Sequence, residues 1–272
     1  MHEKIISYAS IVFFVCIAFE FLLARKRKRH EYRINDAINS LSLGVMSQIS
    51  GVFLKALSIG IYSWIYQHTG WLQLDASNPL VWLSGLLFYD FLYYWLHRFG
   101  HETALLWAAH VVHHQSESYN LSTALRQTSS GALFGWVFYV PMALLGWPPE
   151  VFLVIALIDL LYQFWVHTEQ IGKLGWFDRI FVSPSNHRVH HAVNDIYLDK
   201  NYGGILIIWD RLFGTYSDEL DQHPVVFGTR SPLRSWNPLW ANLEVYLAVA
   251  KDAWHTRRYV DKLKIWLMPP GW

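Results

Sequence analysis

Long apolar runs separated by short polar segments dominate the first half of the chain. The first run, Ile5 to Ala24, contains Glu20 as its only charged residue and has about the 20-residue length of a helix that crosses a bilayer. A basic run follows it directly, Arg25-Lys26-Arg27-Lys28-Arg29-His30. Because a cleaved signal peptide carries its positive charge before the apolar run, this order predicts an uncleaved span whose C-terminal end lies in the cytosol.

Four further apolar segments approach or reach the length of membrane helices. Asn39 to Tyr66 is long enough to return across the bilayer, and Leu80 to Leu96 leads directly into His97. Gly131 to Trp147 and Val151 to Val166 flank a Pro-Pro-Glu turn, which predicts a helical hairpin that starts and ends on one side. Each hairpin arm is about 25 Å of helix, so it crosses marginally or dips into the bilayer. Counting crossings from the basic run places His97 and the end of the hairpin on the cytosolic side.

The residues from Glu169 onward are more polar and contain Gly, Pro and Asn turn signals. We expect this part to form a cytosolic cap on a single membrane-embedded domain, residues 1–272, because the chain has no internal repeat and no long linker. The predicted fold class is therefore all-α. We expect a polytopic bundle of about four or five membrane helices with a histidine-rich helical cap on the cytosolic side.

The composition agrees with a membrane protein. Hydrophobic residues make up 53% of the 272 residues and charged residues only 16%, which is more apolar than an ordinary soluble domain. A formal net charge of +1 provides no long-range field of the kind that attracts nucleic acid, so we expect no nucleic-acid partner. The only cysteine, Cys16, excludes an intrachain disulfide and a zinc finger. Any bound metal must therefore have nitrogen or oxygen ligands.

Most of the 14 histidines are clustered. His97 and His101 are four residues apart, a spacing that places both imidazoles on one face of a helix within reach of one ion. His167 follows the second arm of the hairpin. Two copies of His-x-x-His-His complete the set, and we expect each copy to share one helical face: His110, His113 and His114, then His187, His190 and His191. The predicted topology brings all nine side chains to the cytosolic side.

Counting ligands indicates two metal ions. A tetrahedral structural zinc needs four donors and a catalytic zinc takes only three from the protein, so nine imidazoles are sufficient for two ions. A single buried histidine is usually satisfied by a backbone carbonyl, but leaving nine of them unpaired beside a membrane would cost too much free energy. Imidazole binds iron, copper, nickel and zinc alike, so the residues alone do not choose the metal.

Three carboxylates near the histidines are candidates for supporting roles. Asp90 lies seven residues before His97, on the same helical face, and we expect it to accept the free ring N–H of a ligand histidine. The alternative is a structural hydrogen bond to a neighbouring helix. Asp159 precedes His167 by eight residues and invites the same interpretation. Glu102 is a candidate ligand, proton carrier or solvated helix residue. Asp90 and Glu102 are the candidate catalytic residues.

Residues 80–216 resemble the fatty acid hydroxylase and sterol desaturase superfamily, whose members carry such histidine boxes around a di-iron centre. The resemblance lies in four segments: YDFLYYWLHRFGHE, WAAHVVHHQSESYNLSTALRQ, YQFWVHTE and SPSNHRVHHAVNDIYLDKNYGGILIIWDRLFGTY. Matched position by position, it implies that the eight histidines of the boxes are iron ligands. It also implies that His167 is the additional histidine between the boxes and that Glu102 is the glutamate beside the first box.

The resemblance further implies O2 as co-substrate and hydroxylation of an unactivated C–H bond of a membrane lipid. The segments are most similar to the branch that cleaves alkylglycerol ethers with tetrahydrobiopterin as electron donor, although Asn186 stands where eukaryotic members of that branch tend to have a further histidine. No Gly-rich nucleotide fingerprint is evident, so we expect either a diffusible donor or an external reductase as electron-transfer partner.

Two alternatives to hydroxylation remain open from the sequence. The same centre is compatible with a desaturase or methyl oxidase acting on sterols or fatty acids, and clustered histidines also occur in metal transporters. Two segments, Tyr119 to Gln127 and Asp199 to Gly204, are expected either to line a substrate or pterin site or to hold the cap through turn and helix-start hydrogen bonds.

Overall fold

The computed structural model describes residues 2–29 and 31–272, so His30, the last residue of the basic run, lies outside the described residues. The described chain forms eleven α-helices and one short 310 helix. None of these residues belongs to a named strand, and two isolated β-bridges join Phe181 to Leu206 and Ala192 to Phe227. The expected all-α fold class is confirmed for the described chain.

Every apolar run of the sequence is a helix. The five helices are α1 (His2–Lys26), α2 (Ile34–Thr69), α3 (Pro79–Glu102), α6 (Gly131–Leu145) and α7 (Pro149–Trp165). Among the described residues α1 and α2 are long and apolar enough to cross a membrane, and only 11% and 6% of their apolar windows are buried inside the protein. These two helices are therefore not core helices of a soluble domain, because their apolar side chains face outward.

Local sequence sets the ends of these helices. Asn78 caps α3 by accepting a hydrogen bond from the backbone N–H of Leu80, and Pro79 occupies the first helical position. Helix α6 ends at Gly146, whose φ of 101° is a left-handed conformation that glycine adopts without strain. Pro148 and Pro149 then start α7, so the two arms form the predicted hairpin.

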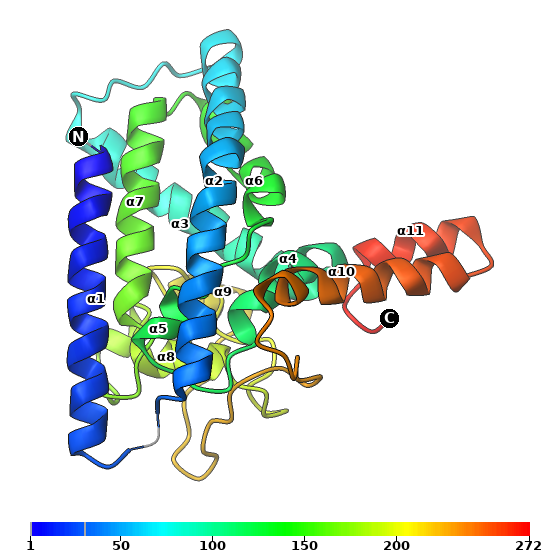
Figure 1. Cartoon of the computed structure of the whole chain (residues 1–272). Coiled ribbons are helices and arrows are strands. Elements are labelled where there is room, and N and C mark those ends of the chain that lie inside the picture. Colours follow the sequence, from blue (N-terminus) through cyan, green and yellow to red (C-terminus); the bar gives the residue numbers. More distant parts are fainter. Residues whose placement is uncertain (1, 30) are drawn as a thin grey trace.

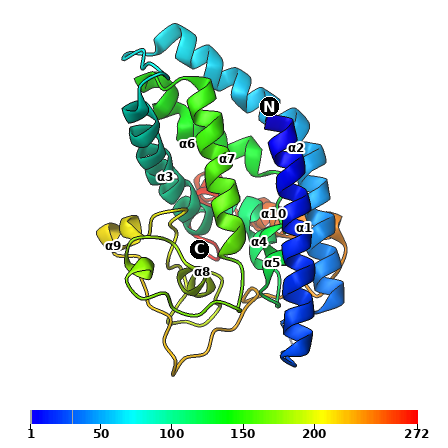
Figure 2. The same cartoon turned by 90° about the vertical axis from the view of Figure 1, so that its left-hand side faces the viewer.

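Helices α3, α6 and α7 pack together through an aromatic core. Tyr89 of α3 stacks on Tyr139 of α6 with ring centroids 4.6 Å apart, and the buried Val151 and Ile155 of α7 belong to the same cluster. The close packing requires Gly85, because a Cβ at this position would lie 2.9 Å from the indole nitrogen of Trp147. Figure 2 shows these three helices grouped beside α1 and α2.

Short helices gather at one end of the long ones. They are α4 (Ala104–His114), α5 (Leu121–Ala124), η1 (Phe177–Arg179), α8 (Pro184–His190) and α9 (Ile208–Phe213). Two helices at the C-terminal end, α10 (Pro238–His255) and α11 (Tyr259–Leu267), form an arm that extends sideways from the bundle, across the direction of α1 and α2 (Figure 1). The cap is thus helical and irregular, and it lies where α1 ends and α2 begins.

A buried ion pair ties α2 to the cap. Arg126, which follows α5, places Nη1 3.2 Å from Oδ1 of Asp36, and only 2% and 3% of the two side chains are exposed. Nε of Arg126 donates to the carbonyl oxygen of Val112 on α4, and Asp36 also accepts from the hydroxyl of Ser116. Burial lowers the pKa of Arg126 to about 10, so the guanidinium keeps its charge at neutral pH.

We expect Asp36→Ala to destabilise the protein far more than removal of an exposed ion pair. Loss of the carboxylate leaves a buried guanidinium without its counter-charge, a change that costs about 3–5 kcal/mol. Glu117→Ala is the matched control, because the Arg33–Glu117 pair is about half exposed on both sides and is worth ~0–1 kcal/mol. Thermal unfolding in detergent checks this, and equal midpoints for the two variants would contradict it.

Candidate metal centre

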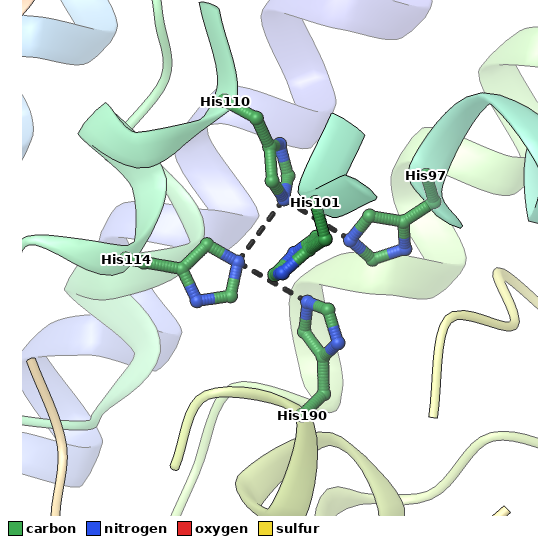
Figure 3. A group of neighbouring side chains, drawn as sticks. All are labelled: His97, His101, His110, His114 and His190. Carbon is green, nitrogen blue, oxygen red and sulfur yellow. Dashed lines mark hydrogen bonds between the residues drawn. The ribbon is translucent and has the colours of Figure 1, made fainter. Parts of the chain in front are cut away.

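Nine histidine side chains converge in two adjacent groups where the long helices meet the cap. The first group contains five, His97, His101, His110, His114 and His190, and the second contains four, His113, His167, His187 and His191. One ring nitrogen from each member lies within 4.8 Å of those from the others in its group. Figure 3 shows the first group, with imidazoles from α3, α4 and α8 pointing toward one another. All of the side chains are buried except that of His110, which is partly buried.

The expectation that each His-x-x-His-His triplet shares one face is wrong. On α4, His110 and His114 belong to the first group, whereas His113 belongs to the second. The physical reason is the helical period, because adjacent residues project about 100° apart and His113 and His114 must diverge. Around α8, His190 likewise faces the first group while His187 and His191 face the second. Each triplet therefore connects the two groups.

Backbone carbonyls fix the orientation of four of the rings. Nδ1 of His97 lies 2.8 Å from the carbonyl oxygen of Tyr202, and Nδ1 of His190 lies 3.0 Å from that of Lys200. In the second group, Nδ1 of His113 and His167 lie 3.0 and 2.7 Å from the carbonyl oxygens of Arg126 and Gln163, respectively. A carbonyl oxygen only accepts a hydrogen bond, so Nδ1 carries the proton in all four rings. Nε2 of each neutral ring is therefore unprotonated and presents a lone pair.

This assignment leaves lone pairs facing each other in the second group. Nε2 of His113 lies 3.1 Å from Nε2 of His167, and both atoms are unprotonated in the neutral rings. Neither nitrogen can donate to the other, so the contact is not a hydrogen bond. Protonation of one ring is disfavoured, because burial lowers the pKa of His113 to about 4 and that of His167 well below its usual value. A cation held between the two nitrogens resolves the conflict.

The first group contains the same conflict in a longer chain of contacts. Nε2 of His110 lies 3.1 Å from that of His97 and 3.0 Å from that of His114, which lies 3.2 Å from that of His190. The two terminal nitrogens, on His97 and His190, are lone pairs. Any placement of protons on His110 and His114 therefore leaves at least one pair of like atoms face to face.

The spacing of these nitrogens fits donors to one ion. Two nitrogens at about 2.1 Å from an ion lie ~3.0–3.4 Å apart when the angle between them is 90–110°. The Nε2 pairs of both groups lie 3.0–3.2 Å apart. In addition, Nε2 of His101, Nδ1 of His187 and Nε2 of His191 are buried without a hydrogen-bond partner among the described residues. The residues present therefore fit a two-metal centre.

Asp90 does not accept a histidine N–H, contrary to the expectation from spacing. Its two carboxylate oxygens accept from the backbone N–H groups of Ile205 and Leu206 and from the indole N–H of Trp209, at 2.7, 3.1 and 2.8 Å. These bonds occupy both carboxylate oxygens and hold the segment that follows Tyr202. Asp90 is therefore connected to His97 through the loop whose Tyr202 carbonyl accepts from the ring.

Asp159 and Glu102 also lie outside both groups. Oδ2 of Asp159 accepts from Nε2 of Gln163, and Oδ1 is buried without a hydrogen-bond partner among the described residues. Glu102 accepts from Nε of Arg98 one helical turn earlier, at 2.9 Å, and 39% of its side chain is exposed. The structure thus brings together the nine histidines but not the three carboxylates.

The loop from Asp199 to Gly204 contributes groups that sequence reasoning did not assign. Asp199 and Asn201 have φ values of 57° and 58°, and the buried Asn201 side chain donates to the carbonyl oxygens of Asn186 and Ser217. This conformation turns the carbonyls of Lys200 and Tyr202 toward the rings of His190 and His97. An Asp-x-Asn sequence before two glycines was the available signal, since Asn and Asp tolerate left-handed backbone. The direction in which a backbone carbonyl points cannot itself be predicted from a sequence pattern.

Asn186 has a structural role in place of a further imidazole. It completes a capping box at the start of α8, in which its Oδ1 accepts from the backbone N–H of Ser183 and its own N–H donates to the hydroxyl of Ser183. Arg188 adds a second anchor through paired bonds to Glu219 at 2.9 and 2.7 Å. These contacts fix the helix that carries His187 and His190.

The chain is similar in sequence to a family of hydroxylases and to several named monooxygenases and hydroxylases. The fatty acid hydroxylase family model matches residues 82–215. Alkylglycerol monooxygenase from Xenopus tropicalis is 39% identical over 264 residues, 97% of this chain and 58% of that protein, and the Homo sapiens protein of the same name is 40% identical over 240 residues, 88% and 53%. An ornithine lipid hydroxylase from Rhizobium tropici is 34% identical over 133 residues, 48% of this chain and 40% of that protein.

Residues 82–215 therefore form a domain of the fatty acid hydroxylase family, a family of membrane-associated proteins. It spans little more than half of the two alkylglycerol monooxygenases that it matches. No solved structure matches it.

The division into two groups predicts how single substitutions change the metal content. His187→Ala reduces the four-donor group to three, and we expect the protein to lose about one ion per chain. His190→Ala leaves four donors in the first group and should weaken binding with a smaller loss. His255→Ala on α10 is the control, because this ring is exposed and lies far from both groups along the chain. Inductively coupled plasma mass spectrometry checks the prediction, and an unchanged metal content in His187→Ala would contradict it.

Asp90→Asn tests the indirect support of His97. An amide NH2 would replace one acceptor oxygen and face at least one N–H of the segment after Tyr202, so the loop should loosen. We expect metal affinity to fall about tenfold, as on loss of other residues that orient ligands. Chelator competition measures the affinity. Asp75→Asn is the control, since this exposed carboxylate accepts hydrogen bonds only from Ser77, and equal affinities in the two variants would exclude the proposed support.

Proposed function

We propose that the chain is a di-iron, O2-dependent monooxygenase that hydroxylates an unactivated C–H bond of a membrane lipid. The observation that carries this proposal is the convergence of nine imidazoles in two groups whose Nε2 lone pairs face one another. Membership of the fatty acid hydroxylase family supports iron among the metals that imidazole binds. In this proposal the nine histidines are the metal ligands, and residues 80–216 form the catalytic core of one domain.

The topology that we propose places this centre at the membrane surface. We propose that α3 and the α6–α7 hairpin are embedded in the bilayer together with the long apolar α1 and α2. This gives about four or five membrane helices. The basic run that follows α1 supports a cytosolic position for the end of the bundle where the histidines lie. A lipid chain can then reach the centre from the bilayer while apolar walls exclude water.

Bound iron would supply the redox chemistry that activates O2, and the protein positions it. The Nδ1–H of four ligand rings is directed to backbone carbonyls, which leaves Nε2 free for the metal. The overall reaction inserts one oxygen atom into a C–H bond and reduces the other to water with two electrons and two protons. We propose tetrahydrobiopterin or an external reductase as the electron donor.

An alkylglycerol ether is the substrate that we favour. The support is the similarity, at 39% and 40% identity, to two proteins named alkylglycerol monooxygenase. Hydroxylation of the carbon next to the ether oxygen gives a hemiacetal, which collapses to an aldehyde and glycerol. The similarity to an ornithine lipid hydroxylase keeps hydroxylation of another lipid as the second candidate. Oxidation or desaturation of a sterol or fatty acid is a weaker candidate, supported by the 22% identity over 237 residues to a protein named lathosterol oxidase from Rattus norvegicus. A metal transporter is disfavoured because the histidines collect at one end of the helices.

The iron-loaded, reduced protein should convert alkylglycerols to an aldehyde and glycerol in an O2-dependent reaction. Product analysis by mass spectrometry after incubation with 18O2 distinguishes hydroxylation, which leaves the label in the product, from desaturation, which does not. The aldehyde is reduced to its alcohol as it forms, because its carbonyl oxygen exchanges with water. We expect His113→Ala to lose essentially all activity and His68→Ala, an exposed histidine at the far end of α2, to retain it. Inactivity of the loaded protein toward alkylglycerols, fatty acids and sterols alike would contradict the proposed function.

A further inference from the structure

The helical arm formed by α10 and α11 carries an apolar surface that the rest of the described chain leaves uncovered. On α10 the exposed apolar side chains are Leu239, Trp240, Leu243, Leu247 and Trp254. On α11 and the residues after it they are Tyr259, Val260, Leu263, Leu267 and Trp272. Single exposed apolar side chains are ordinary, but two aligned helices with such faces mark a binding surface.

Four of the five exposed apolar residues of α10 form one stripe. At about 100° per residue, Leu239, Leu243, Leu247 and Trp254 fall within ~80° of helical arc. Tyr246 lies about 20° beyond one edge of the stripe, and its hydroxyl is 2.8 Å from that of Ser130. On the other side, Lys251 lies ~40° beyond the stripe. The stripe is therefore continuous with the side of α10 that meets Ser130, directly before α6.

The arm meets the helix bundle at the level where α3 ends and α6 begins, and α2 continues past it from Leu43 back to Ile34. Besides the contact beside the first residue of α6, the backbone N–H of Ala104, just after α3, donates to the carbonyl oxygen of Met268. Ala241 of α10 packs against Leu43 of α2. From Leu43 to the end of α2 at Thr69 the helix extends ~39 Å, enough to cross the ~30 Å apolar core of a bilayer. Figure 1 shows α10 and α11 running across, not along, the direction of α2.

The charges of the arm suit a phospholipid surface. Residues 238–272 contain five Lys and Arg side chains and three carboxylates. Nζ of Lys262 lies 5.8 Å from the ring centroid of Trp254, and that of Lys264 lies 5.8 Å from the ring centroid of Trp272. Tryptophan beside lysine is typical of the level of the lipid headgroups, where the ring is half in the apolar phase and the ammonium reaches phosphate.

We propose that α10 and α11 form an interfacial anchor that lies in the surface of the bilayer crossed by α1 and α2, with the apolar stripe among the upper acyl chains. The inference rests on the membrane topology of the proposed function. It adds a partner, the phospholipid monolayer on the side of the histidines. The arm contacts α4 at both ends of that helix, through Met268 to Ala104 and through the carbonyl oxygen of Ala241 to the side chain of Gln115. It thereby holds a helix that carries three of the nine histidines at the bilayer surface.

Spin labels on full-length protein in nanodiscs of phosphatidylcholine and phosphatidylglycerol test the anchor. In a Cys16→Ser background, single cysteines replace Leu247, Leu263, His255 or Phe53, the last being 76% exposed on α2. Power saturation compares the collision of each label with O2, which enters the bilayer, and with a nickel chelate, which does not. Labels at 247 and 263 should favour O2 and report a shallow depth, the label at 53 a greater depth, and the label at 255 should favour the chelate.

The outcomes separate this inference from the topology on which it rests. If the labels at 247 and 263 collide with the chelate as often as the label at 255 while the label at 53 is immersed, the arm lies in water and the anchor is wrong. If the labels at 247 and 263 are shielded from both reagents and broaden through spin–spin coupling, a second copy of the chain covers the stripe and the anchor is again wrong. A label at 53 that collides freely with the chelate would overturn the membrane topology itself.

Discussion

The structure depends on one electrostatic constraint, the approach of imidazole lone pairs that cannot hydrogen bond to one another. His113 and His167 direct Nε2 lone pairs at each other across 3.1 Å because both Nδ1 atoms already donate to carbonyls. Such an arrangement is unfavourable without a cation and strongly favourable with one. It gives the chain a site whose stability is linked to metal binding, and it explains why the surrounding cap is so heavily cross-linked by polar contacts.

Several of those contacts hold the orientation of the rings. The ion pair of Arg126 with Asp36 fixes the carbonyl that orients His113, and Asp90 fixes the loop that orients His97. The triplets on α4 and α8 each supply ligands to both groups, so neither group can move without the other. If the interfacial arm lies as proposed, it places this assembly against the lipid phase, from which a long-chain substrate must come.

Much of this was predictable from local pattern. The apolar runs gave the positions of α1, α2, α3, α6 and α7 because helix formation in long apolar segments is decided locally, and the spacing of the histidines indicated a common cluster. The assignment of each triplet to one face failed because the last two histidines of the pattern i, i+3, i+4 are adjacent and project about 100° apart, so they face different groups. The role of Asp90 was misassigned because its partners, Ile205 to Trp209, are more than one hundred residues away and donate through backbone and indole N–H groups that leave no local signature. The backbone carbonyl oxygens that accept from the histidine rings could not be predicted from the sequence for the same reason.

The most direct test of the central claim is anomalous diffraction at the iron edge from crystals of the iron-loaded protein. Two anomalous peaks are expected, one among the five histidines that include His190 and one among the four that include His187. A single peak, or none at saturating iron, with the imidazoles in the arrangement described here, would contradict the account.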